Sequence, residues 1–199
     1  KYTALLYATL FIIISIPAGG IHLTSYIDIG LYSLSYVFIS KNFGVVPYTI
    51  LTLIAVLNRE TGALLALVPF FLKIFQTSYS FRLSAFKNEI FIIAVAVLTV
   101  IGIRIFQGHS EHVITVSEIF AKNFMPTILM STIIVYMGTF SWFLIGKIEI
   151  SNIEKAYIFI LVINIILVFF FGLFREIRIF APYTFLFAIL LSKKLKSMD

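Results

Sequence analysis

Long apolar runs are the feature that most constrains how this chain can fold. Of its 199 residues, 61% are hydrophobic and 12% are charged, whereas a soluble domain is about 45–50% apolar and about 25% charged. The excess of apolar residues is spread along the whole chain, so neither half has the composition of a soluble domain. Most of this surface has to face lipid or other buried helices, and the sequence therefore predicts an integral membrane protein.

The apolar residues form about eight segments separated by short polar stretches. Because the runs are continuous rather than alternating, they differ from barrel strands, and a helix satisfies its own backbone polar groups in lipid. We expect an all-α, polytopic transmembrane helix bundle that forms a single domain over residues 1–199. Because residue 1 is Lys rather than Met, this domain could be a fragment of a longer membrane protein. The segments are Thr3–Gly19, Ile27–Ser40, Val45–Leu57, Gly62–Phe75, Ile90–Phe106, Phe124–Ile145, Ala156–Phe174 and Ile179–Leu191.

Several segments are shorter than the roughly 20 apolar residues that a membrane-spanning helix needs. Short runs flank Arg59-Glu60, and another lies beside Arg175–Arg178. These charged motifs are therefore expected to lie below the membrane surface, where charge is tolerated if it is paired or lines a wet cavity. Short or broken spans are also typical of binding sites in membrane proteins.

The positive charges divide unequally if all eight segments cross the membrane and both termini are cytoplasmic. The outer cations would mostly be Arg, which binds carboxylate or phosphate through a planar fork, and the inner ones mostly Lys. More cations would lie on the inner side than on the outer side, which agrees with the positive-inside rule for a protein of the plasma (inner) membrane. The inner set is Lys1, Lys41, Lys73, Arg82, Lys87, Lys147, Lys155, Lys193, Lys194 and Lys196, and the outer set is Arg59, Arg104, Lys122, Arg175 and Arg178.

The outer arginines predict a site for a phosphate. On a helix, Arg175 and Arg178 are three positions apart and share one face, so the pair could hold one phosphate or pyrophosphate. Glu176 could pair with an arginine or bind a sugar hydroxyl. Alternatively, these motifs are structural ion pairs at helix ends. The candidate phosphate- or substrate-binding residues are Arg59, Arg104, Arg175, Glu176 and Arg178.

Two carboxylates, Asp28 and Glu60, are the candidate catalytic residues, since a carboxylate in a shielded cavity can act as a general base. We expect Asp28 to start a helix that bears Tyr and Ser, within the run Ile27–Ser40. At a helix N-terminus, helix-dipole effects alone would favour a carboxylate. We expect no cofactor and no metal. A divalent cation could bind His109, Glu111 and His112, but two His in a loop lack a third fixed ligand. The net charge of +6 comes from residues that punctuate apolar runs, so we expect no nucleic-acid partner.

Two strings carry a resemblance to known proteins. They are Leu57-Asn58-Arg59-Glu60-Thr61, between two apolar runs, and, far downstream, Phe174-Arg175-Glu176-Ile177-Arg178-Ile179-Phe180-Ala181-Pro182. In both strings, the chain resembles a group of bacterial polytopic membrane proteins that carry an NRET element and a late RE-x-R-x-F-x-P element. The proteins of that group are similar to the GT-C class of membrane glycosyltransferases. Such enzymes carry a catalytic Asp or Glu in a large first outer loop, whereas Gly20–Tyr26 is short. Either Asp28 takes that role, an N-terminal part is missing, or the chain does not act alone.

The resemblance implies transfer of a sugar from a polyprenyl-phosphate donor on the extracytoplasmic side, in cell-envelope polysaccharide biosynthesis. An Arg near an outer cavity would bind the lipid phosphate, and a carboxylate would act as base. Two alternatives remain. The chain could be a transporter, flippase or polymerase-like protein that binds a lipid-linked saccharide without transfer chemistry, or an accessory subunit that contacts other membrane subunits. The expected partners are membrane lipid and a polyprenyl-phosphate-linked sugar.

Overall fold

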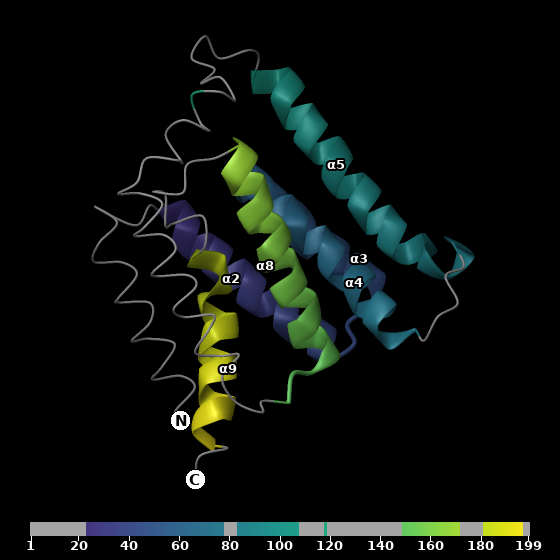
Figure 1. Ribbon diagram of the computed structural model, residues 1–199. Coiled ribbons are helices and arrows are strands. Elements are labelled where there is room, and N and C mark those ends of the chain that lie inside the picture. The colour runs from purple at the N-terminus through teal and green to yellow at the C-terminus, as the bar shows by residue number, and fades with distance from the viewer. Residues whose placement is uncertain (1–22, 78–82, 108–117, 119–148, 172–180, 197–199) are drawn as a thin grey trace.

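The computed structural model describes residues 23–77, 83–107, 118, 149–171 and 181–196 (Figure 1). This part of the chain is helical and contains no strand, so the all-α prediction is confirmed for it. Its α-helices are α2 (Leu23–Ser40), α3 (Val45–Asn58), α4 (Leu67–Gln76), α5 (Lys87–Gln107), α8 (Asn152–Phe171) and α9 (Thr184–Lys196). Its 3₁₀ helices are η1 (Glu60–Ala66), η2 (Leu83–Phe86) and η4 (Ala181–Tyr183).

Six of the predicted apolar segments coincide with these helices, although several helix ends differ. The segments Thr3–Gly19 and Phe124–Ile145 lie outside the described residues. The predicted start of α8 at residue 156 was wrong, because the helix begins with a capping box. Ser151 N–H donates to Glu154 Oε2 at 2.8 Å, and Glu154 N–H donates to Ser151 Oγ at 3.3 Å. These cap residues are polar, so an apolar run does not reveal them.

The predicted run Gly62–Phe75 is divided into η1 and α4. Pro69 lies in the first turn of α4, where its missing N–H is tolerated. In a continuous α-helix, an N–H at position 69 would donate to the carbonyl of Leu65, four residues earlier. The carbonyl instead accepts a hydrogen bond from the hydroxyl of Tyr48 at 2.9 Å. The buried Tyr48 therefore ties the start of α3 to the end of η1.

Contacts between helix ends define one end of the molecule, which we name the Arg end. The side chain of Asn58, at the end of α3, donates to the carbonyl of Thr24, at the start of α2, at 2.9 Å. Near the end of α5, Arg104 Nη2 lies 2.5 Å from Glu60 Oε2. The start of α2 and the ends of α3 and α5 therefore lie together. The Arg end comprises Asp28, Asn58, Arg59, Glu60 and Arg104.

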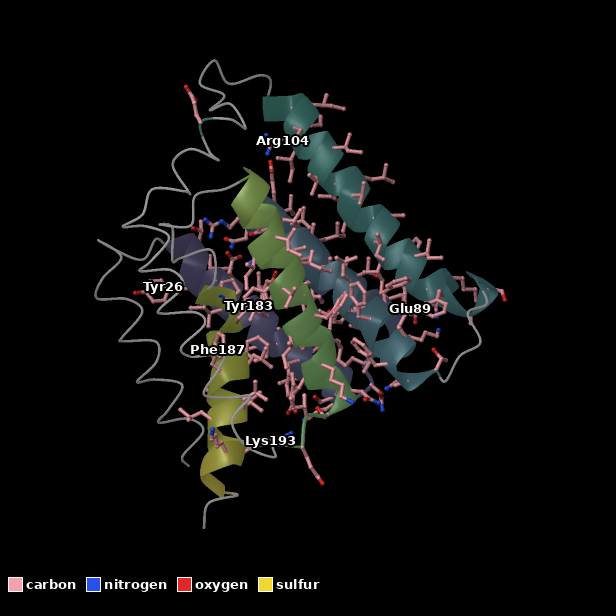
Figure 2. The ribbon with its side chains drawn as sticks, viewed as in Figure 1. Tyr26, Glu89, Arg104, Tyr183, Phe187 and Lys193 are labelled. Carbon is pink, nitrogen blue, oxygen red and sulfur yellow. The ribbon has the colours of Figure 1, made fainter. Side chains whose placement is uncertain are left out.

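The opposite end carries lysines, and we name it the Lys end. Lys73 Nζ of α4 lies 3.0 Å from Glu89 Oε1 of α5, and Lys193 Nζ of α9 lies 2.7 Å from Glu154 Oε2 of α8. Figure 2 shows Lys193 and Arg104 at opposite ends of the bundle. The predicted separation of Arg from Lys is therefore present among the described residues. The Lys end comprises Lys41, Lys73, Lys87, Lys155 and Lys193.

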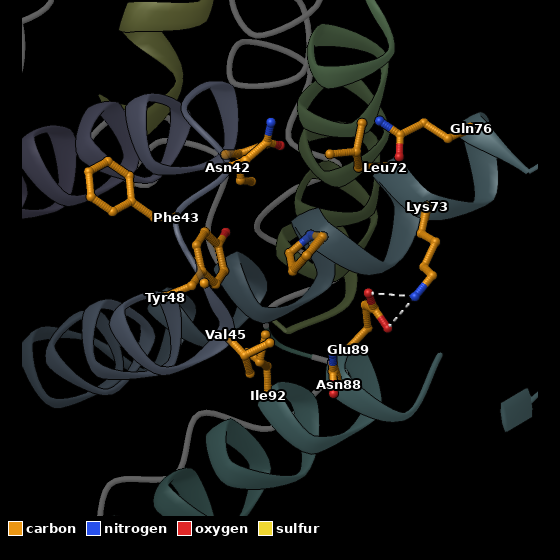
Figure 3. Close-up of a pocket in the computed structure, with 13 residues that line it drawn as sticks. Asn42, Phe43, Val45, Tyr48, Leu72, Lys73, Gln76, Asn88, Glu89 and Ile92 are labelled. Atoms are coloured by element: carbon orange, nitrogen blue, oxygen red, sulfur yellow. Dashed lines mark hydrogen bonds and ion pairs between the residues drawn. The ribbon is translucent and has the colours of Figure 1, made fainter. Parts of the chain in front are cut away.

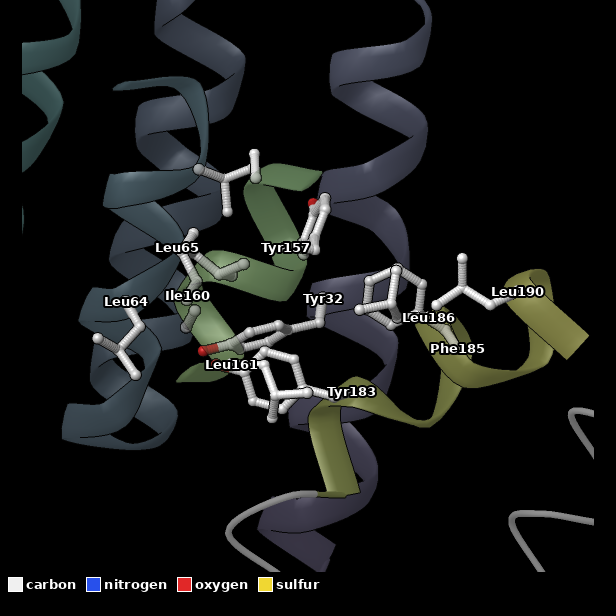
Figure 4. Packing of buried hydrophobic residues seen from close by; sticks show 13 residues of the cluster. Tyr32, Leu64, Leu65, Tyr157, Ile160, Leu161, Tyr183, Phe185, Leu186 and Leu190 are labelled. Atoms are coloured by element: carbon white, nitrogen blue, oxygen red, sulfur yellow. The ribbon is translucent and has the colours of Figure 1, made fainter. Parts of the chain in front are cut away.

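The larger hydrophobic core lies between α2, η1, α4, α8 and α9 and is rich in tyrosine (Figure 4). The rings of Tyr157 and Phe185 meet edge to face with centroids 5.2 Å apart, a favourable arrangement for aromatic pairs. The buried hydroxyl of Tyr157 lies 2.5 Å from Ser35 Oγ. Polar partners thus accompany the aromatic rings into the core. Its fully buried members include Tyr32, Leu65, Val68, Tyr157, Ile160, Tyr183 and Leu186.

The outer surface of α5 is strongly apolar. Within the part of the chain that the structure describes, one helical stretch, Ser84–Phe106, is long and apolar enough to cross a membrane. It runs from η2 into α5 and has 23 residues and a mean hydropathy of 2.4. Only 11% of its most apolar stretch is buried inside the protein, whereas a core helix of a soluble protein would be mostly buried. Side chains such as Leu98 and Ile105 are exposed. This helix is therefore the candidate membrane span of the described chain.

We predict that Gly62→Ala destabilises the protein, because η1 packs tightly against α3. A Cβ at Gly62 would lie 2.3 Å from the backbone carbonyl carbon and oxygen of Ala55, whereas a Cβ at Gly30 would meet nothing within 4 Å. The free energy of unfolding should fall by about 1–3 kcal/mol, the usual cost of overpacking. Denaturant unfolding in detergent micelles measures it. Gly30→Ala is the matched control and should leave stability unchanged or raise it; equal stability of both variants would contradict this packing.

Candidate functional site

Asp28 is the buried acidic residue of the Arg end, with only 1% of its surface exposed. It was predicted to begin its helix, which was wrong, because α2 already includes Leu23. The helix dipole acts within the first turn, so it does not explain a carboxylate at position 28. The explanation is the end of α3, whose side chains reach across to the carboxylate.

Asn58 and Arg59 share the two oxygens of the Asp28 carboxylate. Asn58 Nδ2 donates to Asp28 Oδ1 at 2.6 Å, in addition to its bond to the Thr24 carbonyl. Arg59 Nη1 lies 3.7 Å from Asp28 Oδ2, which makes an ion pair without a hydrogen bond. A buried carboxylate is tolerated only when paired and hydrogen-bonded. Asn58 supplies the hydrogen bond, and Arg59 supplies the opposite charge.

The backbone break after α3 directs Arg59 toward α2. The helix ends at Asn58, and Arg59 is extended, with φ −162° and ψ 136°. Its N–H still bonds the carbonyl of Ala55 at 2.9 Å, while its carbonyl accepts from the N–H of Gly62 at 2.8 Å. One residue thus closes α3 and opens η1. The predicted interruption between the two apolar runs is confirmed at this residue.

Three buried side-chain atoms lack a hydrogen-bond partner within the described part of the chain: Asp28 Oδ2, Arg59 Nη1 and Tyr183 Oη. Buried polar groups are normally paired. Tyr32, one helical turn after Asp28, packs edge to face on Tyr183 with ring centroids 5.3 Å apart and donates to the carbonyl of Thr61 at 3.2 Å. The three atoms therefore belong to one region around the start of α2. Together they offer an acceptor, a charged donor and a hydroxyl.

Glu60 and Arg104 form a second, more exposed ion pair beside this region. Their side chains are 33% and 70% exposed, and the closest nitrogen and oxygen are 2.5 Å apart. Exposed pairs of this kind contribute about 0–1 kcal/mol to stability. The pair neutralises Arg104 and occupies the Glu60 carboxylate. Of the two described arginines, Arg59 is consequently the one with an unused buried donor.

Several predicted site residues lie outside the described residues. They include the second arginine motif, Arg175, Glu176 and Arg178, and the loop residues His109, Glu111 and His112. Their roles in phosphate or cation binding stay predictions. Within the ranges that the structure describes, no group of three or more His, Asp and Glu side chains is arranged to hold a metal ion.

Three residues of this region were not predicted from the sequence as parts of a site: Asn58, Tyr32 and Tyr183. Asn58 had a signal, since it lies in the string shared with the NRET element. Tyr183 directly follows Pro182 of the second string. Tyr32 had no such sequence signal, because Tyr is common in this chain. The role of Tyr32 appears only where α2 packs on η4. Sequence separations of about 30 and more divide these partners.

We predict that Asn58 and Asp28 stabilise the fold as a coupled pair. Asn58→Ala leaves the buried Asp28 Oδ1 and the Thr24 carbonyl without their donor, so the free energy of unfolding should fall by about 1–3 kcal/mol. A double-mutant cycle with Asp28→Ala should give a coupling energy of about 0.5–3 kcal/mol, measured by denaturant unfolding in micelles. As control, Asn58→Ala and Glu154→Ala, at opposite ends, should be additive. Additivity of the Asp28 pair as well would refute the contact.

Comparisons with protein-family models, with curated proteins and with solved structures gave no match. The resemblance of residues 57–61 and 174–182 to GT-C-like proteins stays a prediction. A functional interpretation therefore has to come from the geometry of the Arg end. This region combines a buried carboxylate, a half-buried guanidinium whose Nη1 is buried, and a buried phenol, all with unused hydrogen-bonding capacity, where α2 meets the end of α3 and η4.

Proposed function

We propose that this chain is a multi-pass membrane protein that binds a polyprenyl-phosphate-linked sugar at the Arg end and transfers the sugar, as a GT-C-like hexosyltransferase. The observation that carries the proposal is the pair of unused buried atoms, Arg59 Nη1 and Asp28 Oδ2, 3.7 Å apart. A phosphate oxygen complements the guanidinium, and an acceptor hydroxyl complements the carboxylate. A phosphorylated sugar and its acceptor together present both groups.

In this mechanism Arg59 and Asp28 have different roles. Arg59 donates to the phosphate and stabilises the charge that develops as the phosphate departs, the kind of electrostatic term that contributes most in many enzymes. Asp28 Oδ2 accepts the proton of the acceptor hydroxyl as general base, while Asn58 orients the carboxylate through Oδ1. We further propose that Arg175 and Arg178 complete the anion site and that Glu60, Glu176 and Arg104 border it.

The membrane placement in this proposal follows from the charges and from α5. The apolar helix Ser84–Phe106 supports a membrane span, and the positive-inside rule assigns the Lys end and both termini to the cytoplasm. The Arg end would then face the extracytoplasmic side, where polyprenyl-phosphate sugars are used by the enzymes that the chain resembles. Cell-envelope polysaccharide biosynthesis is the corresponding process.

A transporter, flippase or polymerase-like protein for lipid-linked saccharides is the second candidate. The observation that favours it is the break at Arg59, where α3 gives way to an extended residue and a 3₁₀ helix. Discontinuous helices form substrate sites in many transporters. The same arginine would then bind the anionic lipid-linked sugar without cleaving it.

We predict that Arg59→Ala lowers sugar transfer from a polyprenyl-phosphate donor by about 10²–10³-fold, the loss expected when one stabilising donor is removed. Asp28→Asn, which keeps the shape of the side chain but removes the base, should also abolish most of the transfer. Transfer of labelled sugar is measured in membranes that contain the full chain. Lys87→Ala, an exposed cation at the Lys end, is the matched control and should keep wild-type transfer.

The same assay separates the two candidates. The transferase is supported if the wild-type protein turns the donor over covalently and if Arg59→Ala weakens donor binding. Movement of the intact labelled donor across the membrane without turnover would favour the transporter. Unchanged transfer in both Arg59→Ala and Asp28→Asn would refute the proposed mechanism.

A further inference from the structure

A cavity of about 340 Å³ lies at the Lys end, lined by the connection between α2 and α3 and by parts of α3, α4 and α5 (Figure 3). Its volume is within the range of about 300–1,000 Å³ that is usual for small-molecule sites. Tyr48, in the first turn of α3, lines it, whereas Arg59 follows the last turn. The length of α3, about 20 Å at 1.5 Å per residue, separates this cavity from the Arg end.

The charged groups of this cavity neutralise each other. Lys73 Nζ donates to Glu89 Oε1 at 3.0 Å, to Glu89 Oε2 at 3.2 Å and to the carbonyl of Ala85. An ammonium group has three donors, so these acceptors use all of them. Figure 3 shows the pair side by side at one edge of the cavity. The lining therefore presents no unpaired charge, and an ionic ligand would find no counter-ion.

Carboxamides surround the opening of the cavity. Asn42, Gln76 and Asn88 come from the α2–α3 connection, α4 and α5 and have exposed side chains. No hydrogen bond joins these three side chains to another residue in the described ranges. Each offers an acceptor oxygen and two N–H donors. Asn42 has a positive φ of 54°, a conformation that Asn adopts more readily than most residues.

The inner wall of the cavity is apolar and aromatic. The ring of Tyr48 faces the cavity from α3, with Leu72 of α4 and Ile92 of α5 on other sides (Figure 3). The Tyr48 hydroxyl already donates to the carbonyl of Leu65, so mainly its ring is available. The cavity thus combines neutral donors and acceptors at the opening with apolar surface inside.

We propose that this cavity binds an uncharged, hydroxylated ligand, a hexose, either free or as the headgroup of a glycolipid. Each hydroxyl of a sugar donates and accepts, as a carboxamide does, and the C–H surface of the ring packs on apolar and aromatic side chains. The internally neutral Lys73–Glu89 pair disfavours an anionic headgroup. The site is separate from the Arg end and does not depend on the function proposed for it.

The first test uses the wild-type full chain in amine-oxide micelles, which contain no sugar. Acetylation of Lys73, which lines the cavity, is followed by mass spectrometry with added glucose, a glucosyl diacylglycerol or phosphatidylglycerol. If glucose protects Lys73 from acetylation, a free sugar is sufficient to occupy the cavity. If only the glucosyl lipid protects Lys73, the ligand is the headgroup of a glycolipid. Lys155, outside the cavity, serves as the internal control. The proposal is overturned if neither sugar protects Lys73 or if phosphatidylglycerol protects it equally.

The second test uses variants of the carboxamides. Gln76→Ala combined with Asn88→Ala should weaken the apparent affinity about tenfold for each lost hydrogen-bonding group. The matched control is Asn152→Ala, which removes a carboxamide of the Lys end that does not line the cavity. The double variant should unfold at the wild-type temperature, because its changed side chains are exposed. Wild-type affinity in a folded double variant would overturn the proposal.

Discussion

The burial of one carboxylate is the constraint on which the Arg end depends. Asp28 has almost no exposed surface, and a charge in such a place needs both an opposite charge and hydrogen bonds. Asn58 and Arg59 supply them from the end of α3. Because Asn58 also holds the carbonyl of Thr24, α3 cannot shift along α2 without taking the donor away from that carbonyl and from the buried Asp28 carboxylate. One polar contact therefore sets how these helices align.

The break after Asn58 converts this alignment into a site. Gly62 lets η1 lie directly on the backbone of Ala55. Pro69 has no backbone N–H, so η1 and α4 do not form one continuous α-helix with all its hydrogen bonds. The chain can consequently turn at Arg59, direct its guanidinium at α2 and place Glu60 beside Arg104. The unused atoms of Asp28 and Arg59 result from this turn, because Asn58 occupies one carboxylate oxygen and leaves the other.

Much of the fold could be predicted because hydropathy is a property of short stretches of chain. The apolar runs gave the described helices, and the division of Arg from Lys appeared in the structure at opposite ends. The start of α8 was missed because Ser151 and Glu154 are polar cap residues. Asp28 and Arg59 were predicted as site residues from charge, but their contact, and the part of Tyr183, depend on helices that pack across long sequence separations.

By itself, the sequence determined that the described part of the chain is helical, where the helices α3 and α4 are interrupted and which cations lie at which helix ends. Hydropathy, proline, glycine and charge act locally, so they can be read along the chain. Only the tertiary structure decided which polar atoms are satisfied, since that depends on partners from other helices. It paired Glu60 with Arg104, left Asp28 Oδ2 and Arg59 Nη1 without hydrogen bonds, and formed an open cavity between α2, α3, α4 and α5 at the Lys end.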